Sequence, residues 1–124
     1  MQSELEQASL NEREQRTVER LVELLSQELG ADLRAIWLYG SRARGERPSP
    51  ESDVDLMIIA DGGWDRYEQR AIELLFEAAD EHGLAPTWFS IKTFGPEWVE
   101  DRRSIRSFFI QEVDRDKIVL YGEP

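Results

Sequence analysis

The sequence predicts an α/β (α+β) domain. Some segments repeat apolar residues at the spacing of an amphipathic helix, and short continuous apolar runs, typical of buried strands, alternate with them. A chain of 124 residues can bury one hydrophobic core and is too short to form two separate cores. We therefore expect a single domain over residues 9–124 and a flexible N-terminus over residues 1–8.

Two segments have the periodicity of long helices. The first should begin near Ser9 or Asn11 and end at Gly30, which is a typical C-terminal stop. Glu12 or Glu14 lies three residues after one of these caps, as a capping box requires. The residues expected to be buried are Val18, Leu21, Val22, Leu25 and Leu29 in this helix, and Ile72, Leu75, Phe76 and Ala79 in a second helix over residues 66–82.

Four segments are expected to form strands. Their residue ranges are 35–39, 54–60, 86–92 and 117–121. Between the last two strands, residues 94–98 indicate a turn into a brief helix, and the apolar residues of 105–113 indicate one further helical face.

The polar loop between the first two strands has the most informative sequence. Gly40 and Ser41 close the first apolar run, so free backbone N–H groups and the Ser41 hydroxyl can face phosphates where a helix begins. Asp53 and Asp55 open the second apolar run. Residues i and i+2 of a strand share a face about 6.5 Å apart, so both carboxylates can reach a pair of Mg²⁺ ions roughly 3.5–4 Å apart. The loop therefore indicates a phosphate site opposite a metal site.

Charge and composition restrict the partners. The net charge of −11 argues against duplex DNA or an anionic membrane as the main partner, because both attract basic surfaces. Arg42, Arg44 and Arg47 nevertheless make the loop positive, which favours bound anions. Cysteine is absent, which excludes a thiolate nucleophile or metal ligand. The N-terminal residues do not have the pattern of a signal peptide, so we expect a cytoplasmic protein.

The motif resembles the signature of the nucleotidyltransferase superfamily of DNA polymerase beta. It consists of Gly40-Ser41, eleven intervening residues and Asp53-Val54-Asp55. The loop is one residue longer than is usual in that family, and its Pro-Ser-Pro segment can accommodate the extra residue. The order of predicted helices and strands over residues 10–121 is most similar to the minimal nucleotidyltransferases, the antitoxin partners of HEPN toxins.

This resemblance implies a fold, a reaction and a partner. The fold is the small nucleotidyltransferase fold, in which a mixed or antiparallel sheet packs against helices on one side. The reaction is the transfer of AMP from ATP, or of another nucleoside monophosphate from its triphosphate, to an acceptor hydroxyl. Asp53 and Asp55 would be the catalytic Mg²⁺ ligands, and Gly40, Ser41, Arg42 and Arg44 would bind the nucleotide. The acceptor would be a tyrosine of a HEPN-type toxin, with no direct contact to nucleic acid or membrane. A homo-oligomer remains open, because residues 105–113 can pack on a partner or on their own sheet.

One position departs from the family pattern. Active members often carry a third carboxylate on a later strand, yet residues 86–92 contain no acid. Glu97 and Asp101 follow this strand, and the spacing favours neither as a substitute. The alternative interpretation is therefore a catalytically impaired module that binds a nucleotide or caps a toxin.

Overall fold

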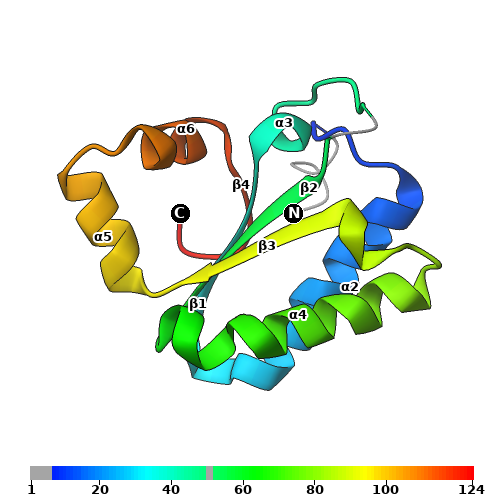
Figure 1. Ribbon diagram of the computed structural model, residues 1–124, viewed down its shortest axis with the longest axis horizontal. Helices are drawn as coiled ribbons and strands as arrows, with labels where there is room; N and C mark the ends of the chain where they lie inside the picture. The colour runs from blue at the N-terminus through cyan, green and yellow to red at the C-terminus, as the bar shows by residue number, and fades with distance from the viewer. Residues whose placement is uncertain (1–6, 50–51) are drawn as a thin grey trace.

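The computed structural model describes residues 7–49 and 52–124, which form a mixed sheet between two pairs of helices (Figure 1). The order of the strands across the sheet is β3-β2-β1-β4. The strands are β1 (Leu33–Tyr39), β2 (Val54–Ala60), β3 (Phe89–Phe94) and β4 (Ile118–Gly122). β1 is antiparallel to β2 and β4, whereas β2 and β3 are parallel. This confirms the predicted fold class. Residues 1–6 of the predicted flexible N-terminus (residues 1–8) lie outside the described residues.

Helix α2 (Glu12–Leu29) begins with one of the two capping boxes that the sequence allows. The Asn11 side chain accepts a hydrogen bond from the Glu14 amide at 2.8 Å, and the Glu14 carboxylate accepts one from the Asn11 amide at 2.9 Å. The helix ends at Gly30, whose φ of 55° is typical of glycine. Its buried face contains every apolar residue predicted for it.

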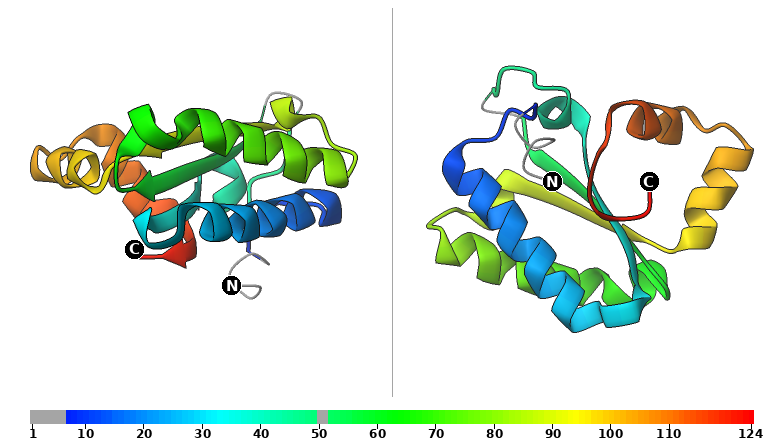
Figure 2. Two further views of the ribbon diagram at one scale, coloured as in Figure 1. Left: turned by 90° about the horizontal axis from the view of Figure 1, so that it is seen from below. Right: turned by 180° about the vertical axis from the view of Figure 1, so that it is seen from behind.

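Helix α4 (Gly63–Glu81) lies beside α2 on the same face of the sheet (Figure 2). Its buried stripe consists of Ala71, Leu74, Leu75, Ala78 and Ala79. The prediction that Ile72 and Phe76 are buried is wrong, and Phe76 is 54% exposed. Both stripes have helical spacing, but the alanines allow the close helix packing that larger side chains would prevent.

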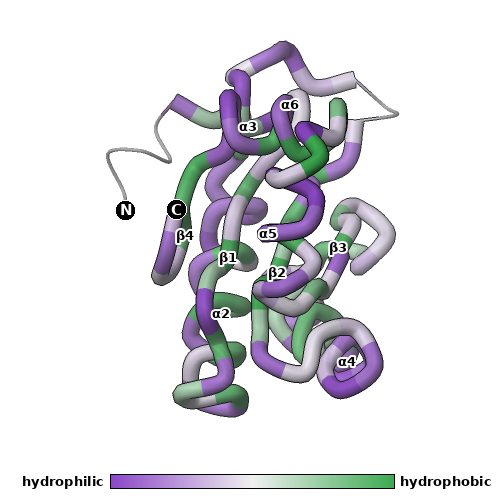
Figure 3. The backbone as a smooth tube through the Cα atoms, turned by 90° about the vertical axis from the view of Figure 1, so that its left-hand side faces the viewer, coloured by the Kyte–Doolittle hydropathy of each residue, from purple (hydrophilic) through white to green (hydrophobic). Residues whose placement is uncertain are grey.

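The opposite face of the sheet is also covered, so the prediction of helices on one side needs correction (Figure 1). Helices α5 (Pro96–Ser104) and α6 (Phe108–Asp116) pack there against β1 and β2. Almost every residue of these two strands is buried, and continuous apolar runs of this kind are typical of strands covered on both faces. Figure 3 shows the hydrophobic residues along β1 and β2 and the hydrophilic ones around the short helix α3 (Gly40–Ala43).

The C-terminal helical segment also differs from the prediction of one face over residues 105–113. The chain turns between α5 and α6, where Arg106 has a φ of 53° and the Ser107 hydroxyl accepts a hydrogen bond from the Ile110 amide. The Ser107 cap starts a new helix in a new direction. Within the described residues, no helix is long and apolar enough to cross a membrane.

Candidate active site

The sheet register brings the two halves of the sequence motif together. Tyr39, the last residue of β1, pairs with Asp55 near the start of β2, so Gly40 follows directly beside the Asp55 carboxylate. A Cβ atom added to Gly40 would lie 2.4 Å from Oδ2 of Asp55. The Gly-Ser turn and the aspartates therefore meet at one end of β1 and β2.

Gly40 is required at this position for two reasons. Its φ is 78°, and any side chain would overlap Asp55. We expect Gly40→Ala to destabilise the fold by about 1–3 kcal/mol and to weaken Mg²⁺-ATP binding at least about tenfold. Urea denaturation and isothermal titration calorimetry measure the two effects.

Gly83→Ala is the matched control, because Gly83 has a φ of 68° and an equally close contact, to the Arg13 side chain. It should destabilise the fold without changing ATP affinity. Equal losses of affinity in both variants would show that Gly40→Ala acts through stability alone.

Helix α3 and its C-cap residue Arg44 contain the residues predicted to bind phosphate. Ser41 lies in its first turn, where backbone N–H groups have no partner within the helix. The Arg44 guanidinium lies at the edge of the site, paired with Glu46 and, at 3.5 Å, with Asp116 of α6. Arg44 is partly exposed, so it can reach a bound anion. Arg47, further along the loop, is exposed.

Arg42 does not occupy the position that the sequence predicted. Its side chain is 3% exposed and points into the domain, where its guanidinium donates to both carboxylate oxygens of Glu14. Further hydrogen bonds go to the carbonyls of Ser9 and Ser52 and to the Ser52 hydroxyl. These bonds use all five donors of the guanidinium. We therefore correct the assignment of Arg42 as a phosphate ligand: it ties the motif loop to the start of α2.

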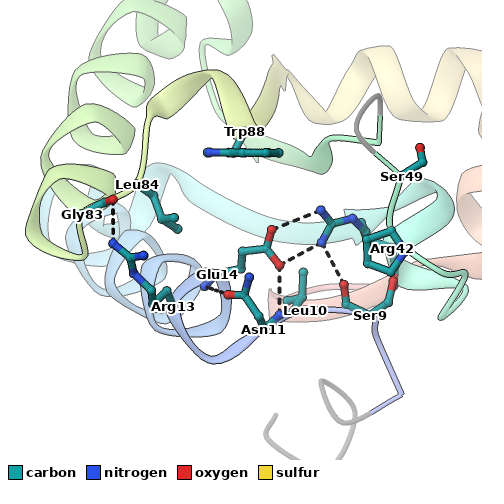
Figure 4. A pocket seen from close by; sticks show the side chains of 11 residues that line it. Ser9, Leu10, Asn11, Arg13, Glu14, Arg42, Ser49, Gly83, Leu84 and Trp88 are labelled. Carbon is teal, nitrogen blue, oxygen red and sulfur yellow. Dashed lines mark hydrogen bonds and ion pairs between the residues drawn. The ribbon is translucent and has the colours of Figure 1, made fainter.

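The cavity of about 780 Å³ in Figure 4 lies on the α2 side of this ion pair. Arg42 and Glu14 line it together with Leu10, Leu84 and Trp88, and the Trp88 ring lies across from the ion pair. The Asp55 carboxylate and the Gly-Ser turn do not belong to its lining. We place the candidate active site at the end of β1 and β2 because the motif residues meet there.

The two aspartates differ in their surroundings. Asp53 is exposed just before β2, whereas Asp55 is half-buried. Burial and the negative charge of Asp53 raise the pKa of Asp55, and the positive charges of Lys92, Arg42 and Arg44 partly oppose this rise. A half-buried carboxylate beside a second negative charge is a favourable ligand for a cation.

Strand β3 carries no acid beside Asp55. In the parallel pairing, Ser90 lies next to Asp55 and Lys92 next to Met57. Because β2 and β3 are parallel, Asp55 lies beside the start of β3. Glu97 follows the other end of β3. Asp101 lies in the same helix, α5. The register therefore gives neither acid a position beside Asp55.

Sequence reasoning missed the acids that α6 brings to the Gly-Ser turn. Glu112 lines a small pocket of about 140 Å³ together with Tyr39, Gly40 and Arg44, and Asp116 pairs with Arg44. These contacts depend on how α6 packs on the sheet, which no local spacing reveals. Glu14 was missed as an ion-pair partner for the same reason.

Comparison with known proteins identifies the family. The family model described as polymerase beta nucleotidyltransferase matches residues 19–91, which contain the whole motif and strands β1 and β2. The chain belongs to this family. No curated protein sequence matches this nucleotidyltransferase.

Solved structures share the fold of this nucleotidyltransferase. A mutant of the toxin-antitoxin MntA-HpeT superposes with a TM-score of 0.53 at 21% identity, covering 93% of this chain and 75% of that one. A toxin-antitoxin with AMP-PNP gives a TM-score of 0.53 at 21% identity, covering 85% of this chain and 73% of that one. At this level of identity the likeness shows the fold alone.

Residues of this nucleotidyltransferase fit a divalent cation that is held jointly with substrate. Within residues 7–49 and 52–124, no group of three or more acidic, histidine or cysteine side chains is placed to hold a metal. The site offers the carboxylates of Asp53 and Asp55. Mg²⁺ is commonly bound by one or two carboxylates together with substrate phosphates and water, so this donor set suits Mg²⁺ bound with a nucleoside triphosphate.

Because the pKa of Asp55 is raised, we expect its ionised carboxylate to destabilise the folded protein when no metal is bound. Because the folded state holds the Asp55 proton more tightly than the unfolded chain, the free energy of unfolding falls as pH rises from the ordinary aspartate pKa through the raised one. We expect Asp55→Asn to remove this loss and to be more stable than the wild type at pH 7, by roughly 0.5–1 kcal/mol. Urea denaturation in EDTA between pH 4 and 7 measures the difference.

The difference between the two proteins should shrink toward pH 4. Asp65→Asn, at an exposed acid in the first turn of α4, is the control and should show no such gain. A wild type that is as stable as Asp55→Asn at pH 7 would contradict the predicted repulsion.

Proposed function

We propose that this protein transfers AMP from ATP, or another nucleoside monophosphate from its triphosphate, to an acceptor hydroxyl in a Mg²⁺-dependent reaction. The observation that carries the proposal is the contact between the Gly-Ser turn and the Asp55 carboxylate. The Gly-Ser turn, which we propose binds phosphate, lies beside Asp55, and Asp53 precedes Asp55 by two residues; membership of the nucleotidyltransferase family supports the reaction class.

Each residue has a separate role in this proposal. Gly40 lets the backbone approach Asp55, and the Ser41 hydroxyl and nearby amides hold the β- and γ-phosphates. Arg44 adds a charge-assisted hydrogen bond. Asp53 and Asp55 hold Mg²⁺, which neutralises charge on the phosphates when bound. Fixing the triphosphate in this way positions the α-phosphorus for attack and supplies several kcal/mol of the barrier reduction.

The transfer exchanges one phosphorus-oxygen bond for another. The acceptor oxygen forms a bond to the α-phosphorus while the bond from that phosphorus to the bridging oxygen breaks. The bonding electron pair leaves with pyrophosphate, and the acceptor proton passes to water. The chain supplies positioning and charge, which are the main protein contributions to phosphoryl chemistry.

A tyrosine is the acceptor that this site suits best. A phenol has a pKa of about 10 and is far easier to deprotonate than a sugar hydroxyl. Strand β3 carries no carboxylate beside Asp55 to take the acceptor proton, so an acidic hydroxyl is favoured. Efficient modification of an aliphatic hydroxyl, with every tyrosine left untouched, would contradict this proposal.

We propose that the acceptor belongs to a HEPN-type toxin in the cytoplasm and that the protein acts as its antitoxin. Two of the similar solved structures are described as toxin-antitoxin, one of them with AMP-PNP, which supports a toxin partner and a nucleotide. A toxin that cuts RNA needs a basic surface, which a chain with a net charge of −11 attracts. The exposed side chains of Ile105 and Phe108, at the turn between α5 and α6, offer an apolar contact for it.

The competing function is a module that binds or caps a toxin without chemistry. The absence of a carboxylate on β3 beside Asp55 favours it. Where a HEPN-type toxin is encoded next to this protein, co-expression with it separates the two functions. An enzyme carrying Asp53→Asn and Asp55→Asn should no longer protect cells, whereas a capping module should protect them as well as the wild type.

The source-cell lysate supplies a second test that needs no known toxin. The purified protein with Mg²⁺ and ATP labelled on the α-phosphate should label a protein, and the double variant should not. No labelled protein, with Mg²⁺-ATP binding intact, would support the non-catalytic module.

A further inference from the structure

The strand order places the phosphate-binding turn and Lys92 on opposite sides of Asp55. β2 lies between β1 and β3, so residues 40–44 follow β1 on one side and Lys92 lies in β3 on the other. The side chains of Asp55 and Lys92 share a face of the sheet, because Lys92 pairs with Met57 and Met57 follows Asp55 at i+2.

Lys92 lies within reach of the site. Its backbone is about 6.6 Å along the sheet and about 4.8 Å across it from that of Asp55, a span that the flexible four-carbon stem of lysine can largely cover. Its charge acts on Asp55, since it lowers the pKa of that carboxyl against the effects of burial and Asp53.

Lys92 is also uncommitted in the fold. The second lysine of the chain, Lys117, pairs with Asp114 and lies over the Trp37 ring. Lys92 is exposed and forms no salt bridge with the residues that the structure describes. Helices α5 and α6 cover Ile59, Tyr39 and their neighbours on this face, and they leave Lys92 open to solvent.

The direction of attack on the α-phosphorus indicates which substrate group Lys92 can contact. The acceptor oxygen must approach the α-phosphorus in line with, and opposite to, the leaving pyrophosphate. If the pyrophosphate is held at residues 40–44 beside β1, the acceptor approaches from the β3 side. The positive side chain that β3 contributes on that side is Lys92.

We propose that Lys92 is a catalytic residue whose ammonium contacts the acceptor oxygen and stabilises its negative charge after the proton has passed to water. This inference rests on the proposed transfer and deepens it. Lys92 supplies as a fixed charge what a second metal ion would supply there, so the site binds one divalent cation, together with the triphosphate. The substrate class it selects is a hydroxyl that ionises readily, such as a phenol.

Lys92→Gln tests the contact with the acceptor. We expect transfer to the labelled lysate protein to fall about 100-fold, and the affinity for Mg²⁺-ATP to change by less than about twofold. The pH dependence of transfer should move upward by about one unit, because the acceptor would have to ionise without a cation beside it. Arg16→Gln, which removes an exposed charge on α2, should leave all three quantities unchanged.

A structural role for Lys92 would not shift the pH dependence. Unchanged transfer would overturn the proposal, and so would a loss of ATP affinity equal to the loss of transfer, which would assign Lys92 to the triphosphate.

Binding of Mn²⁺ to the ATP complex tests the proposal without any transfer. Electron paramagnetic resonance should count one bound Mn²⁺ in the wild type and two in Lys92→Glu, where a third carboxylate would complete a second site. Two ions in the wild type would overturn the inference. If the wild type labels no lysate protein and binds one Mn²⁺ while Lys92→Glu binds two, the proposed transfer and the catalytic contact fail, and the inference that Lys92 takes the place of a second cation stands.

Discussion

Replacing Arg42 with alanine is expected to destabilise the protein by about 3–5 kcal/mol, the largest loss that we predict for a single substitution. The change removes one partner of a buried ion pair and leaves the Glu14 carboxylate, which is 6% exposed, without its guanidinium. It also removes the link between the motif loop and the start of α2. Urea denaturation with a circular dichroism signal measures the loss.

Two further variants separate charge burial from other effects. The double variant Arg42→Met with Glu14→Leu should recover much of the stability, because a buried ion pair can often be replaced by apolar side chains. Arg44→Ala, at a partly exposed ion pair, should cost less than about 1 kcal/mol. A stable Arg42→Ala variant that selectively loses ATP binding would contradict our assignment and restore Arg42 as a phosphate ligand.

Replacing Asp55 with asparagine is expected to reduce nucleotidyl transfer by roughly 1000-fold or more. The substitution keeps the shape of the side chain beside Gly40 and removes the negative charge that would hold the cation. The same variant should be as stable as the wild type or more so, as the raised pKa of Asp55 implies. Initial rates of label transfer from ATP, with Asp65→Asn as the control, measure the loss.

Loss of transfer together with gain of stability is a combination that misfolding cannot produce. A variant that retains more than about one tenth of the wild-type rate would show that Asp55 is not a required metal ligand.

The central part of the fold followed from local patterns. Helical spacing predicted α2 and its buried face, and the apolar runs predicted β1 and β2, because these segments bury side chains at regular intervals. The C-terminal segment could not be predicted as well. The Ser107 cap and the turn at Arg106 interrupt an apolar pattern that is compatible with one helix, and spacing alone does not reveal the interruption.

The approach of the Gly-Ser turn to Asp55 could be predicted from the sequence. Gly40 directly follows β1 and Asp55 lies near the start of β2, and because these strands are antiparallel neighbours, their pairing brings the two residues together. The position of Arg42 could not be predicted, because a sequence reveals that a side chain is charged and not that it is buried. The role of Arg42 depends on Glu14, which is 28 residues away in the chain. Lys92 is similar, because only the parallel register of β3 shows which side of Asp55 it occupies.

The most direct test of the proposed chemistry compares ATP labelled on the α-phosphate with ATP labelled on the γ-phosphate. Each is incubated with the wild type, Mg²⁺ and lysate of the source cells. Nucleotidyl transfer predicts label on an acceptor protein from the α-position, none from the γ-position, and no label in the Asp53→Asn/Asp55→Asn variant. Label from the γ-position, or α-label that survives loss of both aspartates, would contradict the account.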